Sequence, residues 1–279
     1  MMGTSGRPAD SAAVEFDKVS LAFDDHVVLQ DISFSVPKGS MRILLGASGA
    51  GKSLVLKLAL GLLRPDSGTI LVNGNRVTEM AELDLLKMRS DVGMVFQENA
   101  LFDSLTVAEN VGYRLYEESG MALDAVRARV EEVLAFLGLS EVIDRMPSSL
   151  SGGQRRRVGI GRAMASKPCL MLFDDSTTGL DPVISATVDD EIVKLRDLEQ
   201  VTSVVVTQQI RDAMYIATHK TVRNNGHLKV VPVEAPDATR TEFMVLRDGR
   251  IIFHGSAAEL MASEDPYLQR FLYRTLPPW

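Results

Sequence analysis

A glycine-rich segment between an apolar run and a helical pattern constrains the fold more than any other feature of the chain. The segment GASGAGKS, residues 46–53, matches the pattern G-x-x-x-x-G-K-[ST] and follows the apolar run at 41–45. Apolar residues then recur with helical spacing over 52–62. The segment therefore stands where a buried strand passes into a helix, which is the context that a phosphate-binding loop requires.

The loop predicts a nucleotide site. Its glycines let successive backbone N–H groups face inward, and the following helix N-terminus adds partial positive charge. Lys52 is expected to reach the β- and γ-phosphates of ATP, and Ser53 is expected to offer its hydroxyl to Mg²⁺. The expected contacts to the nucleotide come from Gly46, Ala47, Ser48, Gly49, Ala50, Gly51, Lys52 and Ser53. A glycine-rich turn that precedes a helix by chance is the alternative, and the correct flanks on both sides disfavour it.

The second half of such a site should be a buried strand that ends in an acid. The segment CLMLFD, residues 169–174, fits this description. Asp174 is placed to hold Mg²⁺ or its water, and Asp175 is the candidate for orienting the attacking water. A strand that ends in a solvated Asp-Asp turn is the alternative. Cys169 is expected to be a small core residue.

The order of elements predicts an α/β fold. Apolar strands at 41–45, 92–96, 170–173 and 204–206 alternate with helical patterns, which favours a parallel sheet. Short strand-like runs precede them at 14–36, and a further strand ends at the turn Asn73-Gly74. The remaining expectations are a disordered leader at 1–13, a helical block at 105–145, a polar irregular insertion at about 224–241, a strand pair near 244–253 and an amphipathic helix near 266–273.

Composition limits the classes of function. The net charge of −7 gives no basic footprint for nucleic acid, so no nucleic-acid partner is expected. The single cysteine rules out an internal disulfide and fits a reducing compartment. No apolar stretch is long enough to span a membrane, and the first residues contain no apolar signal segment. We therefore expect any membrane role to depend on a partner protein.

A second motif resembles a known family. The pentapeptide LSGGQ at 150–154 lies between the loop and the acidic strand, as the signature of ABC ATPases does. Ser151 and the two glycines are expected to present N–H groups at the start of a helix over 154–165, which makes a second anion site. An ordinary serine N-cap with glycines before an arginine-rich helix is the alternative, and the order of the motifs disfavours it. The resemblance covers about residues 14–260, with the chain's last residues, 261–279, as a helix and tail. It implies that Ser151, Gly152, Gly153 and Gln154 complete the ATP site of a second chain, so that a dimer encloses two ATP molecules.

The resemblance also implies the surrounding architecture and further site residues. It implies a P-loop NTPase core with a mixed sheet, an antiparallel β subdomain and a helical subdomain at about 98–165. Gln97 matches the family's glutamine that touches Mg²⁺ and water and senses the membrane partner. Phe23 stands where an aromatic ring stacks on adenine, with a buried core phenylalanine as the open alternative. Residues 179–181 resemble the loop that crosses the dimer interface.

Two departures from the family pattern concern catalysis. Asp175 replaces a glutamate, and Gln208 replaces the histidine that follows a strand and a threonine; Ser176 also replaces a proline. The shorter Asp175 withdraws its carboxylate, and about 1 Å of misplacement costs on the order of 100-fold in rate. Glutamine can hydrogen-bond a phosphate but cannot carry a proton as histidine does. We expect binding to survive and hydrolysis to be slow.

A narrower resemblance, within the family, concerns the transported substrate. The stretch at 96–117 and the segment DPYLQRFL at 265–272 resemble the ATPases of Mce-type lipid transporters, the Mla/Mkl group. This implies a permease, MCE-domain proteins and small accessory proteins as partners, at the cytoplasmic face of the inner membrane. An importer ATPase for another substrate and a slow ATPase acting as an ATP-gated dimerisation subunit remain open. The acidic charge and single cassette disfavour an ABC protein of DNA repair or the ribosome.

Overall fold

The computed structural model describes residues 12–98, 100–118, 120–224, 227–233 and 240–275. Its central element is a six-stranded sheet in the order β12-β11-β3-β8-β7-β6. Strands β11, β3, β8, β7 and β6 run parallel, and β12 pairs antiparallel with β11 at one edge. The strands are Met41–Gly46 (β3), Val92–Val95 (β6), Leu170–Asp174 (β7), Thr202–Thr207 (β8), Thr241–Arg247 (β11) and Arg250–Gly255 (β12). This mixed sheet confirms the predicted α/β core.

The sheet separates two hydrophobic clusters. In β3, Ile43 and Leu45 pack into one cluster and Leu44 into the other. In β7, Phe173 and Leu172 divide in the same way. Successive side chains of a strand point to opposite faces, so both faces of the sheet are buried. For this reason the strands read in the sequence as continuous apolar runs.

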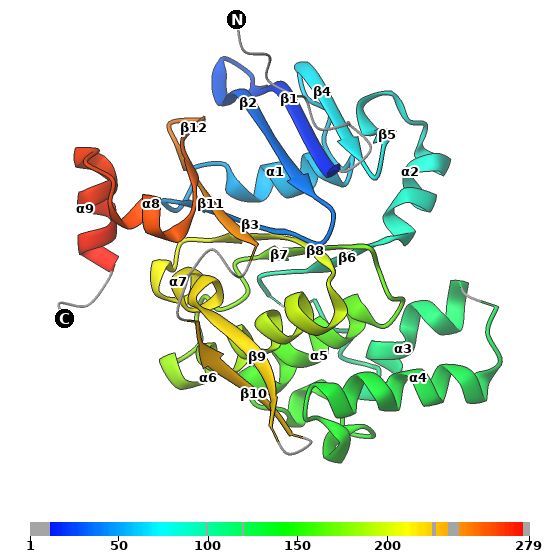
Figure 1. Cartoon of the computed structure of the whole chain (residues 1–279). Helices are drawn as coiled ribbons and strands as arrows, with labels where there is room; N and C mark the ends of the chain where they lie inside the picture. The colour runs from blue at the N-terminus through cyan, green and yellow to red at the C-terminus, as the bar shows by residue number, and fades with distance from the viewer. Residues whose placement is uncertain (1–11, 99, 119, 225–226, 234–239, 276–279) are drawn as a thin grey trace, which may run out of the picture.

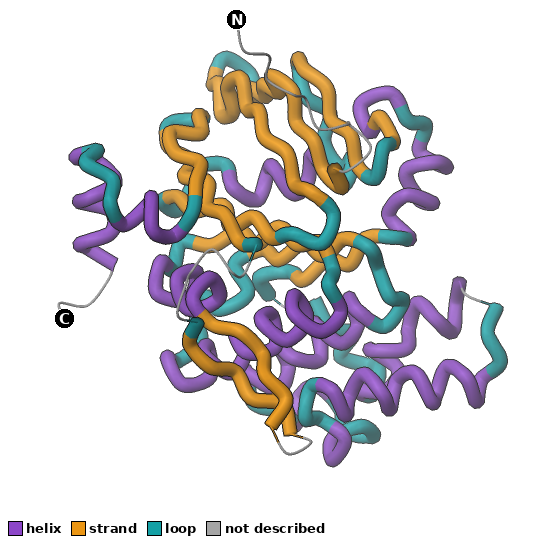
Figure 2. The backbone as a smooth tube through the Cα atoms, in the orientation of Figure 1, coloured by secondary structure: helices purple, strands orange, loops and turns teal. Residues whose placement is uncertain are grey.

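Helices cover both faces of this sheet (Figure 1). Helix α1 (Lys52–Ala59) and helix α2 (Glu82–Ser90) supply residues to one cluster. Helices α6 (Pro182–Lys194) and α7 (Ile210–Thr218) supply residues to the other. Figure 2 shows most of the strands in the upper half and the centre of the view, and most helices in the lower half.

The structure contains the antiparallel sheet that the family resemblance implies, and this four-stranded sheet packs over α1. Its order is β2-β1-β4-β5, and its strands are Ala12–Phe23 (β1), His26–Pro37 (β2), Ser67–Val72 (β4) and Asn75–Arg76 (β5). The sequence predicts several short runs where the structure has the two long strands β1 and β2. Register shifts interrupt the β1–β2 pairing, and Lys18 and Asp31 have left-handed φ values of 48° and 51°. Such bulges break the regular alternation that marks a continuous strand. Residues 12 and 13, expected in the leader, already belong to β1; residues 1–11 lie outside the described part.

The helical segment contains three main helices. They are α3 (Val107–Glu118), α4 (Leu123–Phe136) and α5 (Gly152–Met164). Short 3₁₀ turns, Ser140–Val142 and Pro147–Ser149, connect α4 to α5. Apolar residues of all three helices meet in one cluster with the face of the sheet opposite to α1.

The segment expected to be an irregular insertion is partly a hairpin, so this expectation was wrong for its described residues. Strand β9 (His219–Asn224) pairs with β10 (His227–Pro232) in a separate two-stranded sheet. Polar residues along both strands hide the apolar alternation in the sequence. Residues 225–226 and 234–239 lie outside the described part.

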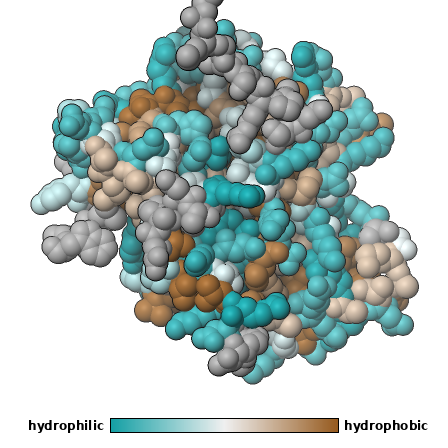
Figure 3. All heavy atoms as spheres, viewed as in Figure 1, coloured by the Kyte–Doolittle hydropathy of each residue, from teal (hydrophilic) through white to brown (hydrophobic). Residues whose placement is uncertain are grey.

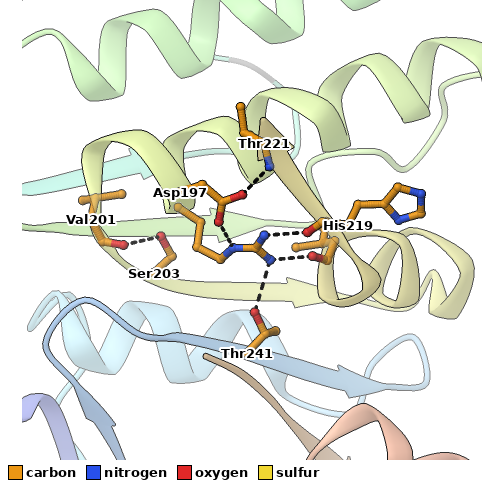
Figure 4. A network of polar contacts seen from close by, with 8 residues as sticks. Asp197, Val201, Ser203, His219, Thr221 and Thr241 are labelled. Carbon is orange, nitrogen blue, oxygen red and sulfur yellow. Dashed lines mark hydrogen bonds and ion pairs between the residues drawn. The ribbon is translucent and has the colours of Figure 1, made fainter. Parts of the chain in front are cut away.

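A buried arginine anchors this hairpin to the cassette (Figure 4). Arg196, 5% exposed, lies in a π-helical turn (Leu195–Glu199) after α6. Its guanidinium donates to the main-chain oxygens of Ile216 and His219, both at 2.6 Å, and pairs with Asp197 at 2.7 Å. The Thr221 N–H in turn donates to Asp197 at 2.6 Å. Hydrogen bonds to charged groups are stronger than neutral ones, so this network fixes the base of the hairpin.

The chain ends on helices α8 (Ala257–Met261) and α9 (Pro266–Thr275). Leu260, Leu268 and Leu272 are buried in the cluster that faces the helical segment. The face shown in Figure 3 is largely hydrophilic, with smaller apolar areas between. Within the described residues, none of the helices has the length and apolar character needed to cross a bilayer.

Candidate nucleotide site

The glycine-rich loop connects β3 directly to α1. Gly49 and Gly51 have φ values of 77° and 96°, which residues with a side chain rarely adopt. A Cβ on Gly46 would lie 2.6 Å from the main-chain oxygen of Leu246, so only glycine lets the loop leave the sheet here. Among the described residues, no side chain caps the first turn of α1. The Leu54 N–H donates to the Gly51 oxygen at 3.0 Å, and no described side chain competes with an anion for the other N–H groups of this turn.

Lys52 lies over the loop. Its side chain is buried, and Nζ donates to the main-chain oxygens of Gly46 at 3.0 Å and Ala47 at 2.9 Å. Burial lowers the pKa of Lys52, while the negative charges of Asp175 and Asp174 oppose this change. The loop and Lys52 border a cleft of about 270 Å³, also lined by Val28, Ser53 and Leu54. A partly desolvated cation at the base of a cleft is suited to binding phosphate.

Ser53 and Asp174 meet although they are far apart in sequence. The Ser53 hydroxyl donates to Asp174 Oδ1 at 2.7 Å. Burial raises the pKa of Asp174, the hydrogen bond from Ser53 lowers it, and the charge of Asp175 raises it. Two hard oxygen donors fit Mg²⁺, which takes its other ligands from phosphates and water. Among the described residues, no group of three or more His, Cys, Asp or Glu side chains is arranged to hold a metal ion.

Asp175 lies at the end of β7, beside the end of β8. Its φ of 49° is left-handed, its N–H donates to the Val206 oxygen at 2.8 Å, and the residue is only 9% exposed. The Thr207 hydroxyl donates to Asp175 Oδ1 at 3.2 Å. Gln208, half-buried, follows in the loop between β8 and α7. The parallel pairing of β7 and β8 thus brings Asp175 and the segment of Gln208 together, while their roles stay predictions.

Gln97 follows β6, the neighbour of β7 in the sheet, and is exposed. A residue that the sequence analysis missed supports this segment. Arg156 of α5, 3% exposed, donates from Nη1 to the Phe96 oxygen at 2.7 Å. Burial lowers the pKa of Arg156, and the charge of Asp175 opposes this. The run Arg155-Arg156-Arg157 was the available signal, because a buried arginine is unusual unless it is paired.

Phe23 is not a core residue. It ends β1, and 46% of its surface is exposed, so the alternative of a buried phenylalanine was wrong. Stacking on adenine stays a prediction for this ring.

The signature segment opens α5. Ser151 is the N-cap, its Oγ accepts from the Gln154 N–H at 3.2 Å, and its own N–H donates to Gln154 Oε1 at 2.9 Å. The expectation of a bare N–H group was therefore wrong for Ser151, which forms a reciprocal capping box with Gln154. Gly152 and Gly153 complete this turn, and a Cβ on Gly153 would lie 2.5 Å from Ile184.

The structure does not bring the signature to the loop of the same chain. Helix α5 packs against α3, α4, α6 and β6, whereas α1 packs against β3, β4, β7 and β8. Figure 1 shows the two helices on opposite faces of the six-stranded sheet. Residues 179–181 connect β7 to α6 near the signature, where Asp181 caps α6 by accepting from the N–H groups of Val183 and Ile184.

Cys169 is exposed, so the expectation of a core cysteine was wrong. Its sulfur accepts from Asn73 Nδ2 at 3.1 Å and lies 3.4 Å from the Asp91 oxygen. The residue lines a cavity of about 330 Å³ with Met171 and Leu195 among others, and none of the predicted site residues lines it. Cys169 precedes β7 by one residue, and burial of the strand begins at Leu170.

Comparison with known proteins points to one family. A family model described as "ABC transporter" matches residues 29–178. The methionine import ATP-binding protein MetN of Bradyrhizobium diazoefficiens is 38% identical over 200 residues, which are 72% of this chain and 58% of that protein. This chain thus spans little more than half the length of that relative. The intermembrane phospholipid transport system ATP-binding protein MlaF of Escherichia coli K12 is 32% identical over 259 residues, 93% of this chain and 88% of that protein.

A solved structure gives the same result. The ATP-binding cassette MJ0796, a dimer in a post-hydrolysis state bound to ADP and Pi, superposes with a TM-score of 0.71 at 26% identity. The match covers 87% of this chain and 98% of that one. The matched family region contains the glycine-rich loop, the signature, Asp174 at the end of β7 and Asp175 directly after it. The chain belongs to the ABC transporter family.

Proposed function

We propose that this chain is the ATP-binding and hydrolysing subunit of a transporter and acts as a dimer, most simply a homodimer. The observation that carries the proposal is the meeting of Ser53 and Asp174 at 2.7 Å beside the uncapped start of α1. Together with Lys52, these groups supply the parts that bind ATP and Mg²⁺. When bound, the metal neutralises charge on the phosphates.

In the proposed site, different residues of this chain bind the nucleotide and orient the attacking water. Lys52 and the N–H groups of the loop bind phosphate oxygens, and Phe23 stacks on the adenine. Asp175 and Gln97 orient the attacking water, and Gln208 contacts the terminal phosphate. Ser151, Gly152, Gly153 and Gln154 of the second chain close the site. The separation of α1 and α5 within one chain supports this arrangement, since one chain alone leaves each half-site incomplete.

We further propose that the subunit works at the cytoplasmic face of the inner membrane beside a permease and powers transport of a phospholipid or another lipid. The match with MlaF extends over 93% of this chain and 88% of that protein, which supports this substrate class. MCE-domain proteins and small accessory proteins are then further partners. Import of another substrate is the second candidate, because the match with MetN has the higher identity, 38% against 32%.

One purification tests these alternatives. The tagged chain is isolated from its native membrane, and the proteins that accompany it are identified by mass spectrometry. We expect a permease together with an MCE-domain protein. A permease with a solute-binding protein would favour the second candidate, and the absence of any permease would contradict the transport proposal. ATP hydrolysis by the purified complex, with Lys52→Ala as the inactive control, tests the enzymatic part.

A further inference from the structure

The Thr207 side chain forms hydrogen bonds with both Asp175 and the main chain of the loop after β8. Thr207 is the last residue of β8 and is 3% exposed. Its hydroxyl donates to Asp175 Oδ1 at 3.2 Å and accepts from the Gln209 N–H at 3.0 Å. Gln209 is the N-cap of α7. A single hydroxyl therefore joins the acid after β7 to the main chain of the loop after β8.

These bonds restrict where the carboxylate can lie. The main chain of Asp175 is already tied to β8 through its N–H and the Val206 oxygen at 2.8 Å. Thr207 is β-branched, so its side chain in a strand has few rotamers and holds its hydroxyl in a fixed direction. Thr207 engages Oδ1, and no hydrogen bond from the described residues reaches Oδ2, so Oδ2 is the less engaged oxygen for a water molecule.

The same hydrogen bonds couple the position of the loop between β8 and α7 to the orientation of the Asp175 carboxylate. A displacement of Gln209 changes the hydrogen bond that its N–H gives to Thr207, and with it the orientation of the hydroxyl that Asp175 accepts from. This coupling passes through the hydroxyl of Thr207 and a main-chain N–H. It does not require a proton-carrying side chain at position 208, where this chain has glutamine.

We propose that Thr207 is the positioning residue for Asp175: its hydroxyl fixes the short carboxylate and links it to the loop before α7. The proposal rests on the proposed ATP hydrolysis. The simpler interpretation is a local turn, because a threonine hydroxyl often accepts from the N–H two residues later. That interpretation explains the bond from Gln209 but assigns no role to the bond to Asp175.

Kinetics of three variants test the proposal in the complete transporter complex. Thr207→Val keeps the branched shape and removes the hydroxyl. We expect kcat for ATP hydrolysis to fall about tenfold to 100-fold, in line with the cost of a misplaced catalytic group, while KM for ATP changes less than about twofold. Thr207→Ser should restore most of the rate. Thr202→Val makes the same change at the other end of β8, where the Thr202 hydroxyl accepts from the Gly39 N–H, and should leave kcat unchanged.

A double-mutant comparison shows whether the effect runs through the acid. In an Asp175→Asn background, Thr207→Val should cause little further loss of kcat, because the carboxylate that it positions is gone. Equal losses in both backgrounds, or an unchanged kcat in Thr207→Val, would overturn the role of Thr207.

Crystal structures of the wild type and Thr207→Val separate this proposal from the proposed hydrolysis. We expect the Asp175 carboxylate to change its rotamer in the variant while the loop at 46–53 stays in place. A carboxylate that keeps its position without the hydroxyl overturns the inference whatever the turnover. A wild type without turnover, but with a carboxylate that moves in the variant, contradicts hydrolysis and leaves the positioning role supported.

Discussion

Helices α1 and α5 both begin at a glycine-containing motif, but their N-termini are satisfied in different ways. At α1 the N-cap is Gly51, and no side chain of the described residues caps the first turn. At α5, Ser151 and Gln154 form a reciprocal capping box. No described side chain therefore competes with a ligand for the N–H groups in the first turn of α1, whereas α5 satisfies two donors with its own side chains.

The side chains around the two helix starts also differ, in charge and in burial. Lys52 and Ser53 in the first turn of α1 lie close to Asp174 at the end of β7. The charges of Lys52 and Asp174 are partly buried. Ser151 at α5 is exposed. This difference supports the proposed two-chain site. In it, the start of α1 holds the nucleotide, and the start of α5 from the second chain, which is stable without a ligand, binds reversibly to it. The predictions below test this division.

The largest effect is expected at α1. Lys52→Ala should weaken binding of Mg²⁺-ATP by about 100-fold, because hydrogen bonds to charged groups contribute roughly 1.5–3 kcal/mol each. Isothermal calorimetry measures the affinity. Lys38→Ala, an exposed lysine before the start of β3 and therefore at the opposite end of that strand from the loop, is the control and should bind normally. Equal affinities of Lys52→Ala and wild type would refute the assignment of the loop.

At α5 we expect dimerisation to fail while binding persists. Ser151→Arg should keep ATP affinity within about twofold, because the signature does not contact the loop of its own chain, yet form at least tenfold less ATP-locked dimer. Light scattering with a non-hydrolysable ATP analogue measures the dimer. Ser140→Arg, at an exposed position of the helical segment, should dimerise like the wild type. An undiminished Ser151→Arg dimer would argue against the two-chain site.

We expect Asp175 and Gln208 to limit the rate of ATP hydrolysis. We expect Asp175→Glu combined with Gln208→His to raise kcat about tenfold or more, since a well-placed general base contributes about 10²–10⁴-fold. ATP affinity should change little, because neither residue makes the main phosphate contacts. Steady-state phosphate release by the wild type, both single variants and the double variant measures the gain. No gain would show that Asp175 already reaches the position of the longer glutamate.

The smallest effect concerns the cap itself. Ser151→Ala removes the N-cap oxygen of α5 and should lower the free energy of unfolding by about 1 kcal/mol. Ser48→Ala, at an exposed position in the loop before α1, should change it by less than about 0.5 kcal/mol. Urea unfolding of both variants gives the comparison. Equal losses would mean that the two helix starts are not capped differently.

Much of the fold follows from local sequence patterns. The apolar runs of β3, β7 and β8 predict buried strands because residues on both sides of a strand are apolar when helices cover both faces. The turn Asn73-Gly74 predicts the end of β4 because both residues adopt left-handed φ values, 50° and 80°. The hairpin β9–β10 was missed because its pairing and its anchor, Arg196, involve residues that local periodicity does not connect.

The sequence by itself determined the glycine-rich loop, the acidic strand and the signature, because each depends on residues that are adjacent in the chain and on the turn or helix start that they form. Only the tertiary structure decided which of them meet. Ser53 reaches Asp174 across 121 positions, and Thr207 reaches Asp175 across 32, because parallel strands bring their carboxyl ends to one edge of the sheet. The same sheet keeps α1 and α5 apart on opposite faces. Contacts of this kind depend on packing between distant segments, which no local pattern specifies.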